Sequence, residues 1–223
     1  MDRDLAQFEL QRHLSAVFDA LPEEERENAW HIQNNLRAIE SNLGRYEAAL
    51  ALKAHGTERV RAAMHEERYG DADVPNHWRL MAARDAAMCT YDVTQMVQAI
   101  DGLTGKSPTL KAGRDMSAAG KAREIIRDHF PRHEKARTDA AHGNEFSSTP
   151  VKLSENRLAE DVDRPGVKLA AASGFYASDN YVSGEYAATV DGKWVTAPFS
   201  EEALSLLRQV YELTVQSFVS SRR

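Results

Sequence analysis

Apolar side chains recur at helical spacing along two long stretches of this chain, and this pattern constrains the fold more than any other feature of the sequence. The stretches are residues 24–55 and 77–103. A spacing of three and four residues places apolar side chains on one face of a helix, and another element must cover that face. Two long helices of this kind predict an antiparallel helical bundle. The stripes consist of Trp30, Ile32, Leu36, Ile39, Leu43, Tyr46, Leu50 and Leu52, and of Trp78, Met81, Ala82, Met88, Tyr91, Val93, Met96, Val97 and Ile100.

Shorter segments supply the other helices of the predicted bundle. Gly56 is expected to end the first long helix, and Thr57 is expected to cap the helix that follows. Pro131 interrupts a later helix because proline lacks a backbone donor, and a short helix then runs to Gly143. Ser200 is expected to cap the last helix. The predicted short helices cover residues 2–20, 57–70, 118–130 (capped by Ser117), 133–143 and the region after Ser200, with a loop over residues 71–76.

The pattern changes between residues 144 and 199. A polar loop with one turn of helix near Asn156 is expected first, and an alternation of period two follows from Val167. Asp191-Gly192 is the strongest signal, because this dipeptide favours a two-residue hairpin turn. We predict a mainly α fold: an antiparallel helical bundle with a small β-hairpin insertion of two or three strands before the last helix. Residues 1–223 are predicted to form a single helical domain, with residues 144–199 as the insertion and strands at 174–176, 181–190 and 193–196.

Composition limits where such a bundle acts. The formal net charge is −6, which disfavours a general nucleic-acid binder. The longest apolar runs are too short to span a bilayer, and the charged N-terminus lacks the apolar core of a secretory signal. Cys89 is the only cysteine, so we expect it to be a small buried hydrophobe. These features predict a cytoplasmic protein with no membrane partner.

Positive charge is concentrated in one part of this acidic chain. Residues 106–137 contain nine Lys or Arg against four Asp or Glu, whereas residues 138–223 contain eight against twelve. Such a segment is typical of a solvated helix face, and an approach path for a polyanion is the alternative. The basic side chains that we expect to line a path for RNA are Lys121, Arg123, Arg127, Arg132 and Lys135.

The basic segment leads into a group of side chains suited to phosphate chemistry. Arg137, Asp139 and His142 lie within two turns of the predicted short helix. The arginine fork binds phosphate, and the imidazole can move a proton near neutral pH. Asp139 and His142 are three residues apart, so the carboxylate is expected to orient the ring. The alternative is that Arg137 and His142 only complement the carbonyl end of the helix.

Helical geometry separates the two principal residues of this group. Positions 137 and 142 differ by five residues, which is about 140° around an ideal helix. Arg137 and His142 therefore do not share a face of a straight helix. The reach of the arginine together with fraying of the helix at Gly143 could bring the two side chains to one substrate, or a second copy of the chain could supply the missing side.

Other polar groups give weaker signals. His129 and His133 are four residues apart, a metal-ligand spacing, but no accompanying Glu or second Cys completes a site. We therefore predict no metal and no cofactor. Arg84 and Asp85 interrupt an otherwise apolar helix, either as a pair that faces solvent or as a polar pair that lines an internal or interface site.

The segment Arg137-Thr-Asp-Ala-Ala-His142 resembles the Arg-x(4–6)-His motif of the HEPN superfamily. The long helix containing Ala83-Arg84-Asp85-Ala86-Ala87-Met88 is also similar to that of bacterial HEPN-like proteins. The resemblance implies a helical bundle that dimerises and brings two motifs into one cleft. Active members are metal-independent ribonucleases, often of toxin–antitoxin or phage-defence systems, and other members are binding modules. Many active members have Asn, Asp or His after the arginine, whereas this chain has Thr138.

Two classes of function follow from these observations. In the first, a cytoplasmic HEPN-like homodimer binds RNA and can cleave it, with Arg137 on the phosphate, His142 as acid–base and Asp139 orienting His142. A cognate antitoxin or another protein is then an expected partner. In the second, a non-catalytic helical dimer binds a protein or a nucleotide. That alternative predicts that His142 points into the bundle and contacts a carbonyl group.

Overall fold

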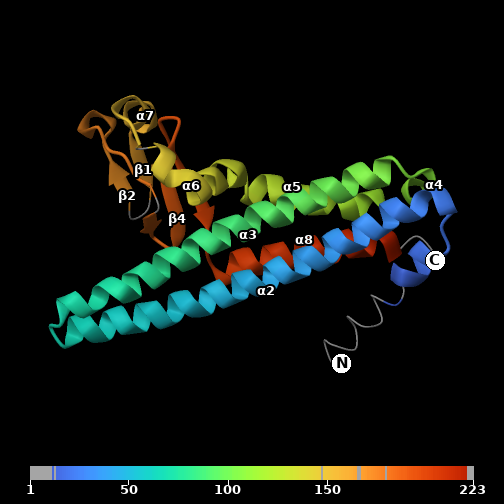
Figure 1. Ribbon diagram of the computed structural model, residues 1–223, viewed down its shortest axis with the longest axis horizontal. Coiled ribbons are helices and arrows are strands. Elements are labelled where there is room, and N and C mark those ends of the chain that lie inside the picture. The colour runs from blue at the N-terminus through green and yellow to red at the C-terminus, as the bar shows by residue number, and fades with distance from the viewer. Residues whose placement is uncertain (1–11, 13, 147, 165–166, 179, 220–223) are drawn as a thin grey trace. The chain divides into compact units, whose positions relative to one another are not determined.

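The computed structural model confirms a mainly α chain with small antiparallel sheets before the last helix (Figure 1). Most of the first predicted helix, residues 2–20, lies outside the described part of the chain. The prediction of a single domain over residues 1–223 stays a prediction. The contacts within the chain group its residues into two compact units. The structure describes residues 12, 14–146, 148–164, 167–178 and 180–219.

We name the two units by their content. The helical unit comprises residues 1–43, 92–129 and 205–223, and the mixed unit comprises residues 44–91 and 130–204. The first two long helices contribute residues to both units. The mixed unit contains Arg137, Asp139 and His142, so it holds the candidate site.

Helix α2 (Glu23–His65) passes through Gly56, so the predicted helix end there is wrong. The Thr57 hydroxyl donates to the Lys53 carbonyl one turn earlier (2.8 Å) and does not cap a new helix. An added Cβ on Gly56 would lie 2.9 Å from the Pro75 carbonyl oxygen. Gly56 is therefore a point of close approach to a neighbouring backbone, which a glycine allows.

Two glycines of α2 offer a matched test of this interpretation. Gly56→Ala is expected to lower the free energy of unfolding by about 1–3 kcal/mol, because the methyl group meets a backbone oxygen that cannot swing away. Gly44→Ala, with open space around its Cβ, is expected to raise that free energy by about 0.5–1 kcal/mol through helix propensity. Urea unfolding of both variants measures the difference, and equal stabilisation would contradict the close approach.

Helix α3 (Asp73–Gly105) starts earlier than predicted. The expected loop over residues 71–76 is replaced by a 3-10 turn, η1 (Tyr69–Ala72), and by the first turn of α3. Pro75 lies in that first turn, where its missing donor costs no helical hydrogen bond. The helix ends at Gly105, two residues beyond the predicted stretch, and Cys89 is buried within α3 as expected.

The helical unit is completed by three further helices, α4 (Pro108–Ala112), α5 (Met116–His129) and α8 (Glu201–Val219). Asp115, not the predicted Ser117, caps α5, since its carboxylate accepts from the backbone N–H groups of Ser117 and Ala118. Ser200 caps α8 as predicted, accepting from Ala203 N (3.1 Å). The core of this unit includes Ile32, Leu36, Ile39, Val93, Val97, Ile100, Ile126, Leu207, Val210 and Phe218.

In the mixed unit, helix α6 (His133–Phe146) contacts the sheet of β3, β4 and β5 (Figure 1). Helix α7 (Pro150–Asn156) agrees with the predicted turn of helix near Asn156. The strands are β1 (Val162–Arg164), β2 (Val167–Leu169), β3 (Asn180–Val182), β4 (Glu185–Val190) and β5 (Lys193–Pro198), in the orders β1-β2 and β3-β4-β5.

Two tight hairpins define the larger sheet. Asp191 and Gly192 both have positive φ and join β4 to β5 as predicted. Ser183 and Gly184 also have positive φ, so the single strand predicted over residues 181–190 is two strands. The strand predicted at residues 174–176 is wrong, because Gly174 is left-handed and ends the 3-10 turn η2 (Ala171–Ser173).

A small apolar core supports this insertion. Leu158, Ala177, Ala187 and Trp194 are buried together. Val162, Val167, Leu169, Phe175 and Val182 pack against them. Within the described residues, no helix is both long enough and apolar enough to cross a membrane.

Candidate functional site

The candidate site lies on α6, whose start and interruption both follow from the local sequence. Pro131 separates α5 from α6 as predicted. The helix does not end at Gly143, however. It continues to Phe146 across a break at His142, where φ is −133° and ψ is 16°. The predicted helix end at Gly143 is therefore wrong, and the helix is instead interrupted at His142 itself.

His142 is exposed and paired with a carboxylate. Its Nδ1 lies 3.1 Å from Glu145 Oε1, and 48% of the side chain is accessible. The non-catalytic alternative predicts that the ring contacts a carbonyl group of the bundle. The ring instead contacts the carboxylate of Glu145. A carboxylate on one ring nitrogen fixes the tautomer and leaves Nε2 to exchange protons with a substrate.

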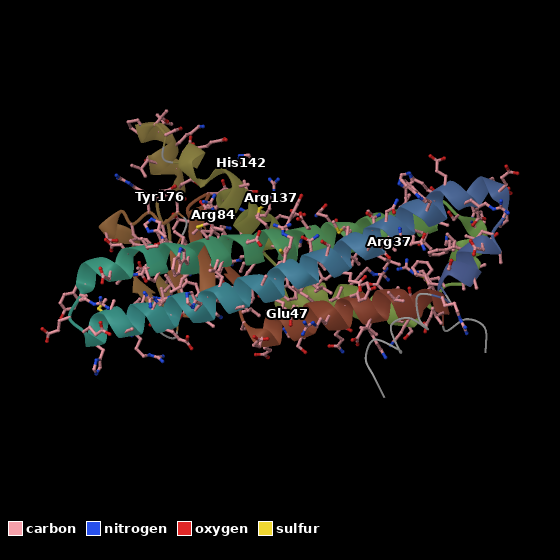
Figure 2. The ribbon with its side chains drawn as sticks, turned by 60° about the horizontal axis from the view of Figure 1, so that its bottom comes forward. Arg37, Glu47, Arg84, Arg137, His142 and Tyr176 are labelled. Carbon is pink, nitrogen blue, oxygen red and sulfur yellow. The ribbon has the colours of Figure 1, made fainter. Side chains whose placement is uncertain are left out.

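Arg137 occupies a different environment on the same helix. Its guanidinium lies over the ring of Tyr91 on α3, with Cζ 5.3 Å from the ring centroid. Its Nε is buried, and the described residues provide neither a hydrogen-bond partner for that atom nor a carboxylate for the guanidinium. The aromatic face thus holds the cation without neutralising it. Figure 2 labels Arg137 and His142 along α6.

Asp139 is buried and holds the sheet against α6. Its Oδ2 accepts from the Tyr186 hydroxyl at 2.5 Å, and its Oδ1 accepts from the Ser178 hydroxyl at 3.1 Å. Only 1% of the residue is exposed. These contacts give Asp139 a structural role that the sequence did not indicate. Its predicted role in orienting His142 stays a prediction.

Most of the predicted RNA-contacting cations already have partners in the structure. Arg123 pairs with Asp101, and Arg127 pairs with Asp128 and Glu124. These two residues and the exposed Lys121 belong to the helical unit. Arg132 and Lys135 belong to the mixed unit, where Arg132 donates to the Trp194 carbonyl and Lys135 pairs with Asp191. The local excess of positive charge is therefore partly neutralised.

Arg84 and Asp85 both line an open cavity, and the side chain of Asp85 is also exposed to solvent, so both interpretations of this pair stay open. Arg84 donates from Nη2 (2.6 Å) and Nε (3.1 Å) to the Ala140 carbonyl, and Asp85 pairs with Arg45. The cavity measures about 570 Å³ and reaches Ala141, the neighbour of His142. The remaining wall consists of Ala48, Ala49, Leu52, Met81, Ala82, Met88 and Ala140.

Two site residues were missed from the sequence, Glu145 and Tyr91. Glu145 could have been found, because residues three apart on a helix are neighbours and a carboxylate follows His142 at that spacing. Tyr91 could not, because it reads as one more apolar residue of the α3 stripe. Its contact with Arg137 depends on how α3 and α6 pack within the mixed unit.

No protein-family model, curated protein or solved structure matches this chain. The site must therefore be interpreted from its own geometry. The described residues contain no group of three or more His, Cys, Asp or Glu side chains placed to hold a metal ion.

Proposed function

We propose that this chain is an HEPN-like endoribonuclease that binds and cleaves RNA as a cytoplasmic homodimer, within a toxin–antitoxin or defence system. The observation that carries the proposal is the pairing of two features on α6. One is an arginine without a carboxylate partner, and the other is an exposed histidine held by a carboxylate. A cation with no internal anion is suited to a phosphate group of a substrate.

The proposed chemistry needs only proton transfer and charge stabilisation. His142 takes the proton from a 2′-hydroxyl, whose oxygen attacks the adjacent phosphorus. The bond to the 5′-oxygen breaks, and that oxygen receives a proton from an imidazolium. Arg137 stabilises the negative charge that develops on the phosphoryl oxygens. The products are a 2′,3′-cyclic phosphate and a 5′-hydroxyl end.

A second copy of the chain completes the proposed site. General base and general acid are needed on opposite sides of the phosphorus, and each chain offers one His142. Dimerisation supplies the second imidazole. It also allows Arg137 of one chain to act with His142 of the other, although the two residues lie on different faces of one helix. Size-exclusion chromatography with light scattering tests this part of the proposal, which requires a dimer at the concentrations where RNA is cleaved.

Arg137 provides the first test of the proposal. Arg137→Ala is expected to lower cleavage of a fluorescent RNA at least about 100-fold, by removing the charge that stabilises the transition state. Arg137→Lys keeps the charge but loses the planar fork, so only a small part of the rate should return. The assay contains EDTA. If Arg137→Ala cleaves RNA at the full rate, Arg137 has no part in the mechanism. Growth inhibition of cells that express this variant, at the level caused by the unmodified chain, would lead to the same conclusion.

One observation favours a second candidate, the non-catalytic interaction module. The cavity beside Arg84 is largely apolar, and Met81 on its wall is 60% exposed. Such a surface is suited to a partner with an apolar face. This candidate expects no turnover with any RNA, and it expects His142→Ala to leave partner binding unchanged.

A further inference from the structure

A second cavity opens at the start of α6, and its lining is strongly cationic. It measures about 270 Å³. We call it the cationic pocket. Its lining contains three Lys or Arg side chains and one carboxylate, so the formal balance favours an anion. The charged and polar lining residues are Arg132, His133, Glu134, Lys135 and Lys193.

The cations of this pocket differ in the ion pairs and hydrogen bonds that they already make within the chain. Lys193 is exposed, and the described residues provide no ion pair for it. Arg132 donates one Nη1 bond, to the Trp194 carbonyl at 2.6 Å, and a carbonyl does not neutralise its charge. Lys135 is shared with Asp191 at 2.8 Å. An incoming anion therefore finds two cations that no described carboxylate neutralises and a third that it can compete for.

His133 adds an atom with unused hydrogen-bonding capacity. Its Nδ1 lies 2.7 Å from the Phe130 carbonyl oxygen and must donate to it, because that oxygen can only accept. Its Nε2 is buried, and no partner for it lies among the described residues.

The position of the cationic pocket allows one RNA strand to contact both the pocket and the proposed cleavage site. Lys135 and His142 are seven residues apart, which places them on one face of α6 up to the break at His142. The separation along the helix axis is about 10 Å, which a short stretch of nucleic-acid backbone spans. We propose that the cationic pocket binds a phosphate group of the RNA backbone, next to the phosphate that is cleaved at His142. This inference rests on the proposed function.

The test is the salt dependence of RNA binding. A single-stranded oligonucleotide of 2′-O-methyl RNA lacks the attacking hydroxyl, so it binds without turnover. Lys193→Ala is expected to weaken binding similarly for all sequences and to reduce the slope of log K against log salt by about 0.7, the value for one phosphate contact on a single strand. Lys152→Ala, a change of an exposed lysine on α7 outside the pocket, should leave the slope unchanged.

A second measurement separates this inference from the proposed function. Pyrophosphate binding is followed by calorimetry for the unmodified chain and for Lys193→Glu. Cleavage that depends on His142, with an unchanged salt slope in Lys193→Ala, would overturn the pocket and leave the ribonuclease standing. An unmodified chain that binds pyrophosphate, with the binding lost in Lys193→Glu, but binds no RNA would overturn the RNA contact and leave only an anion site in the pocket. Binding of neither ligand would overturn the pocket.

Discussion

His142→Ala is expected to lower the rate of RNA cleavage by about 100-fold to 10,000-fold, the range of a general acid–base group. The side chain is half exposed and pairs with the exposed Glu145, so the stability of the fold should change by less than about 0.5 kcal/mol. Initial rates on a fluorescent oligoribonucleotide, measured in EDTA at saturating substrate, test the first expectation. Thermal unfolding tests the second.

Two further variants make the result specific to His142. His129→Ala changes an exposed histidine of α5 and should leave the rate unchanged. Glu145→Gln keeps an acceptor near Nδ1 but removes the negative charge, so it should lower the rate less than His142→Ala does. A contaminating nuclease would be revealed by equal rates in the unmodified chain and in His142→Ala. That outcome would end the catalytic proposal.

The fold was largely predictable because its main signals are local. The stripes of α2 and α3, the Asp191-Gly192 turn and the Ser200 cap each depend on a few neighbouring residues. The errors arose where a residue has two uses. Glycine is a common helix terminator, yet Gly56 lies inside α2, at a point where another backbone passes close to the helix. Sequence alone does not show which neighbouring group packs against the Cα of a glycine.

The site was predictable only in part, for a related reason. Arg137 and His142 stood out by type and spacing, whereas the predicted helix end at Gly143 is an interruption at His142 inside a longer helix. The aromatic face under Arg137 and the cationic pocket depend on tertiary packing within the mixed unit. Lys193 lies about fifty positions from His142 in the chain, and no periodic pattern connects a β-strand residue to the start of a helix.

Asp139→Ala is expected to lower the free energy of unfolding by about 2–4 kcal/mol, the largest stability effect in this region. The variant removes a buried carboxylate that accepts two hydroxyl hydrogen bonds, and bonds to a charged group contribute about 1.5–3 kcal/mol each without adding fully. Urea unfolding measures the change. Asp163→Ala, an exposed carboxylate in the same unit, should change stability by less than about 0.5 kcal/mol.

A double-mutant cycle assigns the origin of that loss and decides between the two roles of Asp139. If the carboxylate acts by holding β4 against α6, Asp139→Ala and Tyr186→Phe should couple by about 0.5–3 kcal/mol in stability. Both variants should then reduce cleavage only as far as they unfold the chain. If Asp139 instead orients His142, folded Asp139→Asn should lose cleavage while folded Tyr186→Phe retains it. The first result would make the motif of this chain a pair, Arg137 and His142, with Asp139 as the support that keeps α6 on its sheet.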